Sequence, residues 1–198
     1  MNLEEGEKAV KFARKVIEAY VKQDPIPKED LGSIFREKQG VFVTIHTYPS
    51  HMLRGCIGIP EPIMPLQDAL VEAATSATRD PRFPPLSEKE LDDIIVEVTI
   101  LTPPKLLDVV DPKEYLSKIK IGRDGLIIRK GSYSGLLLPQ VPVEENWDVE
   151  EFLANTCMKA WLPPDAWLDR DAKLYTFSGQ IFTEIEPRGR IEEKPLHG

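Results

Sequence analysis

Cysteine and histidine are scarce in this sequence. Among 198 residues it has two cysteines, Cys56 and Cys157, and three histidines. Two cysteines cannot form the disulfide framework of a small secreted protein. No CxxC pair occurs, and His46, His51 and His197 are not at zinc-ligand spacing from the cysteines. We expect neither a disulfide nor a metal site. Two alternatives stay open: a disulfide between Cys56 and Cys157, and a site at which His46, His51 and Cys56 come together.

Long apolar runs and clustered positive charge are also absent. No segment approaches the roughly 20 apolar residues that a membrane-spanning helix needs. The acidic, amphipathic N-terminus lacks the apolar centre of a signal peptide. The formal net charge is −8 and no basic run is present, which argues against non-specific binding to nucleic acid. We therefore expect an intracellular, cytoplasmic protein that does not associate with membranes.

Phosphate-binding glycine motifs are missing as well. Neither GxGxxG nor a P-loop pattern occurs among the 12 glycines. Gly122, Gly125, Gly131 and Gly135 instead bound short apolar runs, where they are typical of turns between antiparallel strands. The sequence gives no reason to expect a nucleotide or any other cofactor.

What the sequence does contain is a mixture of helical and strand patterns separated by stiff, proline-rich connections. The 18 prolines are spread along the chain, so they do not mark one long linker. Two capping-box patterns, Asn2 with Glu5 and Asp148 with Glu151, predict helix starts, and 87–90 is typical of a short capped turn. The pattern predicts helices at 3–22, 65–78 and 148–160, and strands at 40–46, 53–59, 94–101, 119–121, 126–129, 136–138 and 173–185.

The order of these elements predicts the fold class. Hairpins are frequent and the strands do not alternate strictly with helices, which favours a mixed α/β, α+β fold with largely antiparallel sheets and flanking helices. We expect one domain over residues 1–186. Residues 187–198 have the pattern of a tail that is ordered only if it docks.

Cys56 is the first candidate for chemistry, in the stretch MLRGCIGIP. A cation lowers a thiol pKa, and in an extended strand Arg54 would share the face of Cys56. Gly55 and Gly58 would leave room for a ligand to approach the backbone. The alternative is a small buried side chain in a bend. Cys157 lies on the apolar stripe of its predicted helix, where a core role fits better.

Two further features could belong to the same site. Glu97 is a charge within a predicted strand, so it either faces solvent or meets a partner such as Arg54 or Arg82. Asp80, Arg82 and Phe83 lie in a proline-stiffened loop that could present an arginine and an aromatic ring to an anionic or planar ligand. In the plainer interpretation, Phe83 fills the core.

Taken together, several segments resemble one known family. In order along the chain they are GVFVTI, LRGCIG, DPRFPP, VEVTILTPP, GRDGLII, GLLLPQVPVE and EEFLANTCMKAWLPPDAW. They are similar to the AMMECR family, of which LRGCIG is the hallmark hexapeptide, and the resemblance covers about residues 3–186. One departure is Trp161, since the family usually has glycine after the alanine. That change should affect the end of the helix more than any site.

The resemblance implies two unequal lobes around a cleft and a protein found in archaea, bacteria and eukaryotes. It implies no settled reaction. Similar domains are joined to, or encoded beside, MEMO-like and radical-SAM proteins, which suggests such partners and a modification pathway. The family pattern includes the site candidates named above: Arg54, Gly55, Cys56, Gly58, Asp80, Arg82, Phe83 and Glu97.

Two hypotheses follow. The chain could be a cofactor-free enzyme with Cys56 and Glu97 as catalytic groups and the remaining candidates holding a small anionic ligand or a flexible segment. It could instead be a non-catalytic adaptor in which LRGCIG is structural or forms a recognition surface. We expect Cys56 to lie mostly buried at the bottom of the cleft and Glu97 to pair with an arginine.

Overall fold

The computed structural model describes residues 1–195, which form two compact units. Unit 1 contains residues 1–101 and 180–195, and unit 2 contains residues 102–179. Each unit has its own hydrophobic core. The fold is mixed α/β with two antiparallel sheets, as the sequence predicted.

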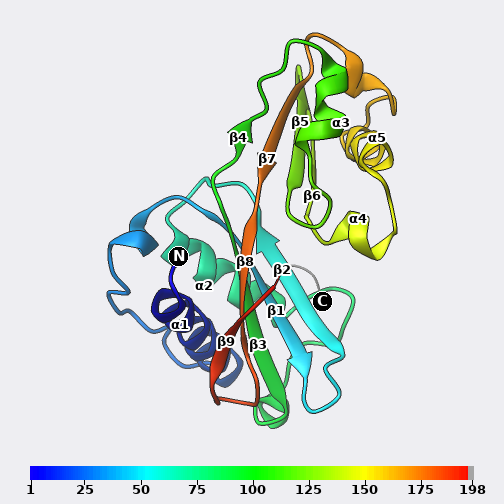
Figure 1. Cartoon of the computed structure of the whole chain (residues 1–198). Coiled ribbons are helices and arrows are strands. Elements are labelled where there is room, and N and C mark those ends of the chain that lie inside the picture. The colour runs from blue at the N-terminus through cyan, green and yellow to red at the C-terminus, as the bar shows by residue number, and fades with distance from the viewer. Residues whose placement is uncertain (196–198) are drawn as a thin grey trace. The chain divides into compact units, whose positions relative to one another are not determined.

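Unit 1 is a five-stranded sheet in the order β2-β1-β3-β8-β9, with two helices on one face (Figure 1). Helix α2 packs against β1 and β2, and α1 packs against β3 and β9. The elements are α1 (Leu3–Lys22), β1 (Gly40–Thr47), β2 (Leu53–Ile59), α2 (Leu66–Ala77), β3 (Ile94–Leu101), β8 (Gly179–Glu184), β9 (Ile191–Lys194), and short 3-10 turns at Ser33–Arg36 and Glu88–Glu90.

Strand alternation divides the two faces of this sheet. Val43 pairs across the strands with Val98, and Ile45 with Val96, and all four are fully buried beneath the helices. On the opposite face the direct neighbours include Thr44 and Glu97. The period of two in β1 and β3 thus separates the residues that fill this core from those on the opposite face.

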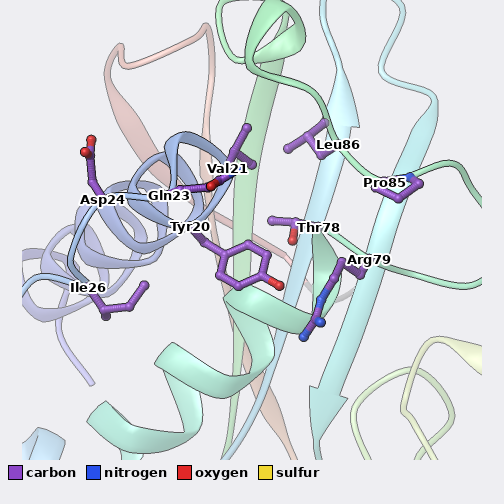
Figure 2. A pocket seen from close by; sticks show the side chains of 9 residues that line it. All are labelled: Tyr20, Val21, Gln23, Asp24, Ile26, Thr78, Arg79, Pro85 and Leu86. Atoms are coloured by element: carbon purple, nitrogen blue, oxygen red, sulfur yellow. The ribbon is translucent and has the colours of Figure 1, made fainter.

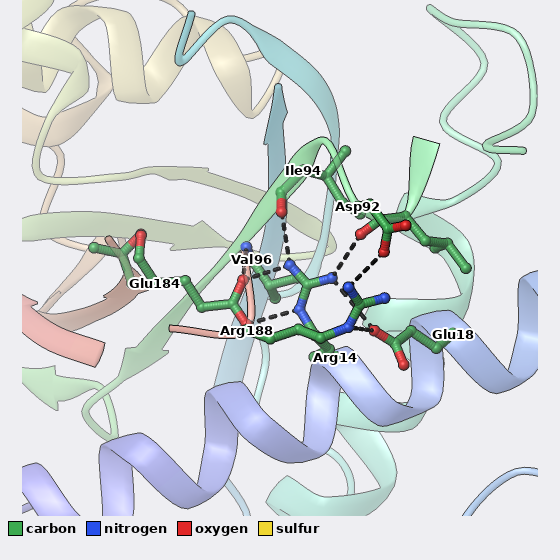
Figure 3. A network of polar contacts seen from close by, with 9 residues as sticks. Arg14, Glu18, Asp92, Ile94, Val96, Glu184 and Arg188 are labelled. Carbon is green, nitrogen blue, oxygen red and sulfur yellow. Dashed lines mark hydrogen bonds and ion pairs between the residues drawn. The ribbon is translucent and has the colours of Figure 1, made fainter. Parts of the chain in front are cut away.

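A buried ion pair joins α1 to the sheet (Figure 3). Arg14 donates from Nε to Glu184 at 2.7 Å, and the two residues are only 4% and 3% exposed. Arg14 also donates to the carbonyls of Leu91 and Ile94, while the backbone N–H of Val96 donates to Glu184. Because the main polar atoms of both side chains have partners, the charges are tolerated inside the core.

Unit 2 is a four-stranded sheet in the order β4-β7-β5-β6. Helix α5 packs on β5 and β6, with Phe152, Leu153 and Cys157 in the core. The elements are β4 (Lys105–Leu106), α3 (Tyr115–Lys118), β5 (Gly125–Lys130), β6 (Tyr133–Leu137), α4 (Val141–Glu144), α5 (Val149–Lys159), β7 (Lys173–Phe177), and 3-10 turns at Pro112–Glu114 and Ala166–Leu168.

Two strand predictions differ from the structure. Residues 119–121 follow α3 without forming a strand, and the second neighbour of β5 is β7 from the far end of the unit. The predicted strand 173–185 is two strands that break at Ser178 and belong to different sheets. The predicted tail is docked in part, since β9 pairs with β8; residues 196–198 lie outside the described residues.

Helix starts and ends follow local rules. The capping boxes at Asn2 and Asp148 form as predicted, as does the capped turn at Ser87. After α5 the chain turns through Trp161, which has φ 61° and is 90% exposed. This left-handed position is one that favours glycine, so the Trp161 departure alters a helix end and leaves the sheet of unit 1 untouched.

Candidate functional site

The sheet of unit 1 brings Cys56, Thr44 and Glu97 into one row. Thr44 on β1 is the direct cross-strand neighbour of Cys56 on β2 and of Glu97 on β3. Opposite residues on antiparallel strands project from the same face, and this is the face that α1 and α2 do not cover. Strand pairing thus joins two of the predicted residues through a threonine that the sequence pattern did not single out.

The Cys56 thiol is half-buried and bonded to this threonine. Thr44 Oγ1 donates to Sγ at a distance of 3.2 Å. Burial raises the pKa of the thiol. The hydrogen bond from Thr44 and the charge of Arg82 both act to lower this pKa, but they do not offset the effect of burial. The group is therefore a protonated thiol at neutral pH. The lowered pKa of a catalytic cysteine is not what this environment provides.

Asp80 and Arg82 bind the backbone of Cys56. Because β2 is the edge of its sheet, the outward N–H and C=O of Cys56 have no neighbouring strand among the described residues. Asp80 accepts from the N–H at 2.9 Å, and Arg82 donates to the carbonyl at 3.3 Å. The two side chains thus replace a neighbouring strand at this residue.

Asp80 and Arg82 are also paired with each other. Arg82 donates from Nε and Nη2 to the two carboxylate oxygens of Asp80, at 3.0 and 2.6 Å. The Asp80 side chain is 1% exposed and that of Arg82 56%. The guanidinium outweighs the effect of burial and, with help from the Cys56 N–H, holds the pKa of Asp80 well below its usual range. The buried Asp80 carboxylate therefore holds both the Cys56 backbone and the Arg82 guanidinium, while Arg82 reaches the surface.

Arg54 lies elsewhere than its spacing from Cys56 predicted. The register shifts in this part of the β1–β2 pair, so that Leu53 and Gly55 oppose the consecutive residues His46 and Ile45, and Arg54 has no cross-strand partner in that pair. Such a bulge redirects a side chain. Arg54 instead donates to Glu90 at 2.7 and 3.2 Å. The cation that acts on the Cys56 thiol is Arg82.

Phe83 lies close to both arginines. The guanidinium carbons of Arg54 and Arg82 are 5.9 and 5.7 Å from the centroid of its ring, within the range of cation–π contacts. Phe83 is half-buried and outside the main core cluster, whereas Leu86 of the same loop is 7% exposed and packs into that core. The interpretation of Phe83 as a core residue was therefore wrong, and Leu86 has that role.

The two glycines of LRGCIG have packing roles. A Cβ on Gly55 would lie 2.3 Å from the backbone oxygen of Ala77, where α2 ends. A Cβ on Gly58 would lie 2.2 Å from the ring of its cross-strand neighbour Phe42. Gly55 thus allows α2 to approach β2 closely, and Gly58 provides space for an aromatic side chain.

Glu97 has partners other than an arginine, contrary to the prediction. Lys194 on β9 donates to it at 3.0 Å, and Nε2 of His46 lies 3.8 Å from its other oxygen. Burial acts to raise the pKa of Glu97, but His46 and Lys194 outweigh it and hold the pKa below its ordinary range. Arg54 and Arg82 lie at the outer edge of β2, with β1 between them and Glu97. The sequence does not reveal this strand order.

The remaining cysteine and histidine expectations have plain outcomes. Cys56 and Cys157 are free thiols, and Cys157 is fully buried in unit 2, where burial raises its pKa to about 11. Among residues 1–195, no group of three or more His, Cys, Asp or Glu side chains is arranged to hold a metal ion. Nor is any helix in this range long and apolar enough to cross a membrane.

Comparison with known proteins identifies the family. The sequence model of AMMECR1 matches residues 10–182. The chain belongs to the AMMECR1 family. Protein MJ0810 of Methanocaldococcus jannaschii is 62% identical over 197 residues, covering 99% of this chain and 98% of the relative. Protein PH0010 of Pyrococcus horikoshii is 55% identical over 197 residues, with 96% and 95% covered.

A solved AMMECR1-type structure has the same fold. The crystal structure of the uncharacterized protein PH0010 superposes with a TM-score of 0.83 at 53% identity, covering 98% of each chain. The names of these relatives state no activity. For AMMECR1 proteins, therefore, family membership establishes the fold, and a function has to be argued from the side chains.

Proposed function

We propose that this AMMECR1 protein is a binding module without catalytic activity, and that Arg82 and Phe83 form its recognition surface. The observation that carries the proposal is the contact of Phe83 with two guanidiniums that are themselves held by buried or half-buried carboxylates. Such an arrangement presents a fixed aromatic ring and a fixed cation, the side chains that most often dominate protein interfaces.

The environment of Cys56 favours this interpretation over a nucleophile. Its pKa is raised, and its N–H and C=O are both occupied by the Asp80–Arg82 pair. The nearby carboxylate of Glu97 has a lowered pKa, so it is a poor base for a thiol. LRGCIG then acts as a structural element whose edge backbone holds Arg82 beside Phe83.

The surface fits a partner that carries an acceptor group next to an apolar or planar group. Arg82 is 56% exposed and uses Nε and Nη2 within the chain, so its Nη1 edge can donate outward. We propose a flexible protein segment as the partner, with MEMO-like and radical-SAM proteins as the first candidates by family association. Both cysteines are free thiols, in keeping with a cytoplasmic location.

Calorimetric titration of the chain against purified MEMO-like and radical-SAM proteins from the same genome tests the proposal. Phe83→Ala should weaken the interaction by about tenfold or more, as expected for an interface anchor. Cys56→Ser should leave it unchanged. Tyr133→Ala is the matched control variant, because it removes an exposed aromatic ring from unit 2, outside the recognition surface.

The competing hypothesis is a cofactor-free enzyme of a modification pathway with Cys56 as nucleophile. It predicts that Cys56→Ser abolishes turnover of the partner while binding is retained. Binding that is lost in Cys56→Ser but kept in Phe83→Ala would overturn the recognition surface. If neither candidate protein binds the wild-type chain, the partner assignment fails.

A further inference from the structure

A second site lies on unit 1, away from the row of Cys56, Thr44 and Glu97. It is a pocket of about 560 Å³ between the end of α1 and the two ends of the loop that follows α2 (Figure 2). Volumes of roughly 300–1,000 Å³ are typical of small-molecule sites. None of the sequence candidates lines this pocket.

Local backbone structure forms the pocket. Helix α1 ends at Lys22, its C-cap residue Gln23 has φ 61°, and the chain then turns away through Asp24. On the other side, the N–H of Leu86 donates to the carbonyl of Thr78 at 2.8 Å and closes the loop between them. The walls are therefore a helix end and a hydrogen-bonded loop base.

Arg79 is the chemically distinctive residue of this pocket. Its guanidinium stacks over the ring of Tyr20, 5.0 Å from the centroid, and the residue is exposed. Arg14, Arg54 and Arg82 of the same unit are paired with carboxylates. Within residues 1–195, Arg79 forms no such pair. The cation–π contact holds the guanidinium beside the ring of Tyr20 and leaves its N–H groups available to an anion.

The rest of the wall is largely apolar and limits the size of the anionic group. Val21, Ile26, Pro85 and Leu86 contribute hydrocarbon surface. Asp24 lies at the opposite side of the pocket from Arg79 in Figure 2, where it disfavours a second negative group. One cation, an apolar wall and a distant carboxylate together select a ligand with one anionic end.

We propose that this pocket binds a small organic anion, with its carboxylate or phosphate on Arg79 and its apolar body against Val21, Ile26 and Leu86. This proposal is independent of the recognition surface at Phe83, because no residue of that surface lines the pocket.

Nuclear magnetic resonance titration of the full chain tests the proposal, with phenyl phosphate and benzoate as probes. Both should shift the backbone amide signals of Thr78, Arg79 and Leu86. Inorganic phosphate lacks the apolar body, and benzyl alcohol lacks the anionic group. Each should therefore bind at least about tenfold more weakly than phenyl phosphate and benzoate. Phenyl phosphate and benzoate also distinguish the two kinds of anionic group.

Variants assign the effect to Arg79. Arg79→Gln should weaken binding by about tenfold or more, whereas Arg79→Lys, which keeps the charge but loses the planar fork, should weaken it less. Arg36→Gln is the control, since it removes an exposed arginine outside the pocket. The amide spectra report whether each variant is folded. Unchanged affinity in a folded Arg79→Gln, equal binding of inorganic phosphate, or no binding of either probe would each overturn the site.

Discussion

Asp80 accepts a hydrogen bond from the backbone N–H of Cys56, with 2.9 Å between its Oδ2 and the Cys56 nitrogen. This cysteine of an edge strand is thus held through its backbone by a side chain from the loop after α2. Arg82 completes the arrangement by donating to the carbonyl of the same residue. LRGCIG thus supplies an edge strand, and DPRFPP supplies the side chains that bond the outward N–H and C=O of Cys56.

The Asp80 hydrogen bonds should contribute strongly to stability. Asp80→Ala leaves the Cys56 N–H without its partner, and we expect the free energy of unfolding to fall by about 2–3 kcal/mol. Asp80→Asn retains an acceptor and should cost less. Urea unfolding of both variants measures the difference. Equal losses would mean that the backbone bond is not the main contribution.

The Arg54–Glu90 pair should make stability depend on pH. The pKa of Glu90 is lowered from 4.5 to about 2, and the hydrogen bond from Arg54 is the main cause. A carboxyl whose pKa is lower in the folded state stabilises the fold above its unfolded pKa and loses that effect as the pH falls through the folded pKa. The contribution of Glu90 should therefore be complete above about pH 5 and disappear between pH 4.5 and about 2.

Comparison of the wild type with Glu90→Gln isolates this effect. Other carboxylates with lowered pKa values, such as Asp80 and Glu97, are present in both proteins and cancel in the difference. Urea unfolding at a series of pH values should show the two stabilities converging as the pH falls. A difference that stays constant down to about pH 3 would argue against the ion pair as the cause.

The two glycines of LRGCIG should respond differently to alanine. In Gly55→Ala the new methyl group meets the backbone of Ala77, which cannot move without shifting the end of α2. We expect a loss of about 2–3 kcal/mol. In Gly58→Ala the obstacle is the half-buried ring of Phe42, a side chain that can rotate, and the loss should be smaller. Thermal unfolding of the two variants ranks them, and the reverse order would contradict the packing roles assigned to these glycines.

The two thiols should differ in their reaction with iodoacetamide. Half-buried Cys56 should react in the native protein with an apparent pKa above the ordinary thiol value, because burial raises its pKa. Fully buried Cys157 should stay unmodified until the chain unfolds.

Rates measured against pH, with peptide mapping, test this expectation. Cys56→Ser should abolish native-state labelling. Thr44→Val removes a hydrogen bond that lowers the pKa of Cys56, so its midpoint should move to higher pH. A rate that reaches its plateau below the ordinary thiol pKa would instead reveal a thiolate and favour the enzyme hypothesis.

Local signals in the sequence were sufficient for most elements. The capping boxes at Asn2 and Asp148 and the glycine between β5 and β6 are recognised within a few residues, and the structure confirms each of them. The strand predicted at 119–121 failed because its apolar residues follow a short helix and their packing is set by residues distant in sequence.

The candidate site shows where local patterns stop being informative. The sequence by itself singled out LRGCIG, DPRFPP and Glu97 as candidates, and all three lie on unit 1. It did not determine the partners, because strand order and register depend on contacts between residues far apart in the chain. The tertiary structure decided that a bulge turns Arg54 toward Glu90, that β1 separates Glu97 from both arginines, and that Lys194 reaches Glu97 from the last strand.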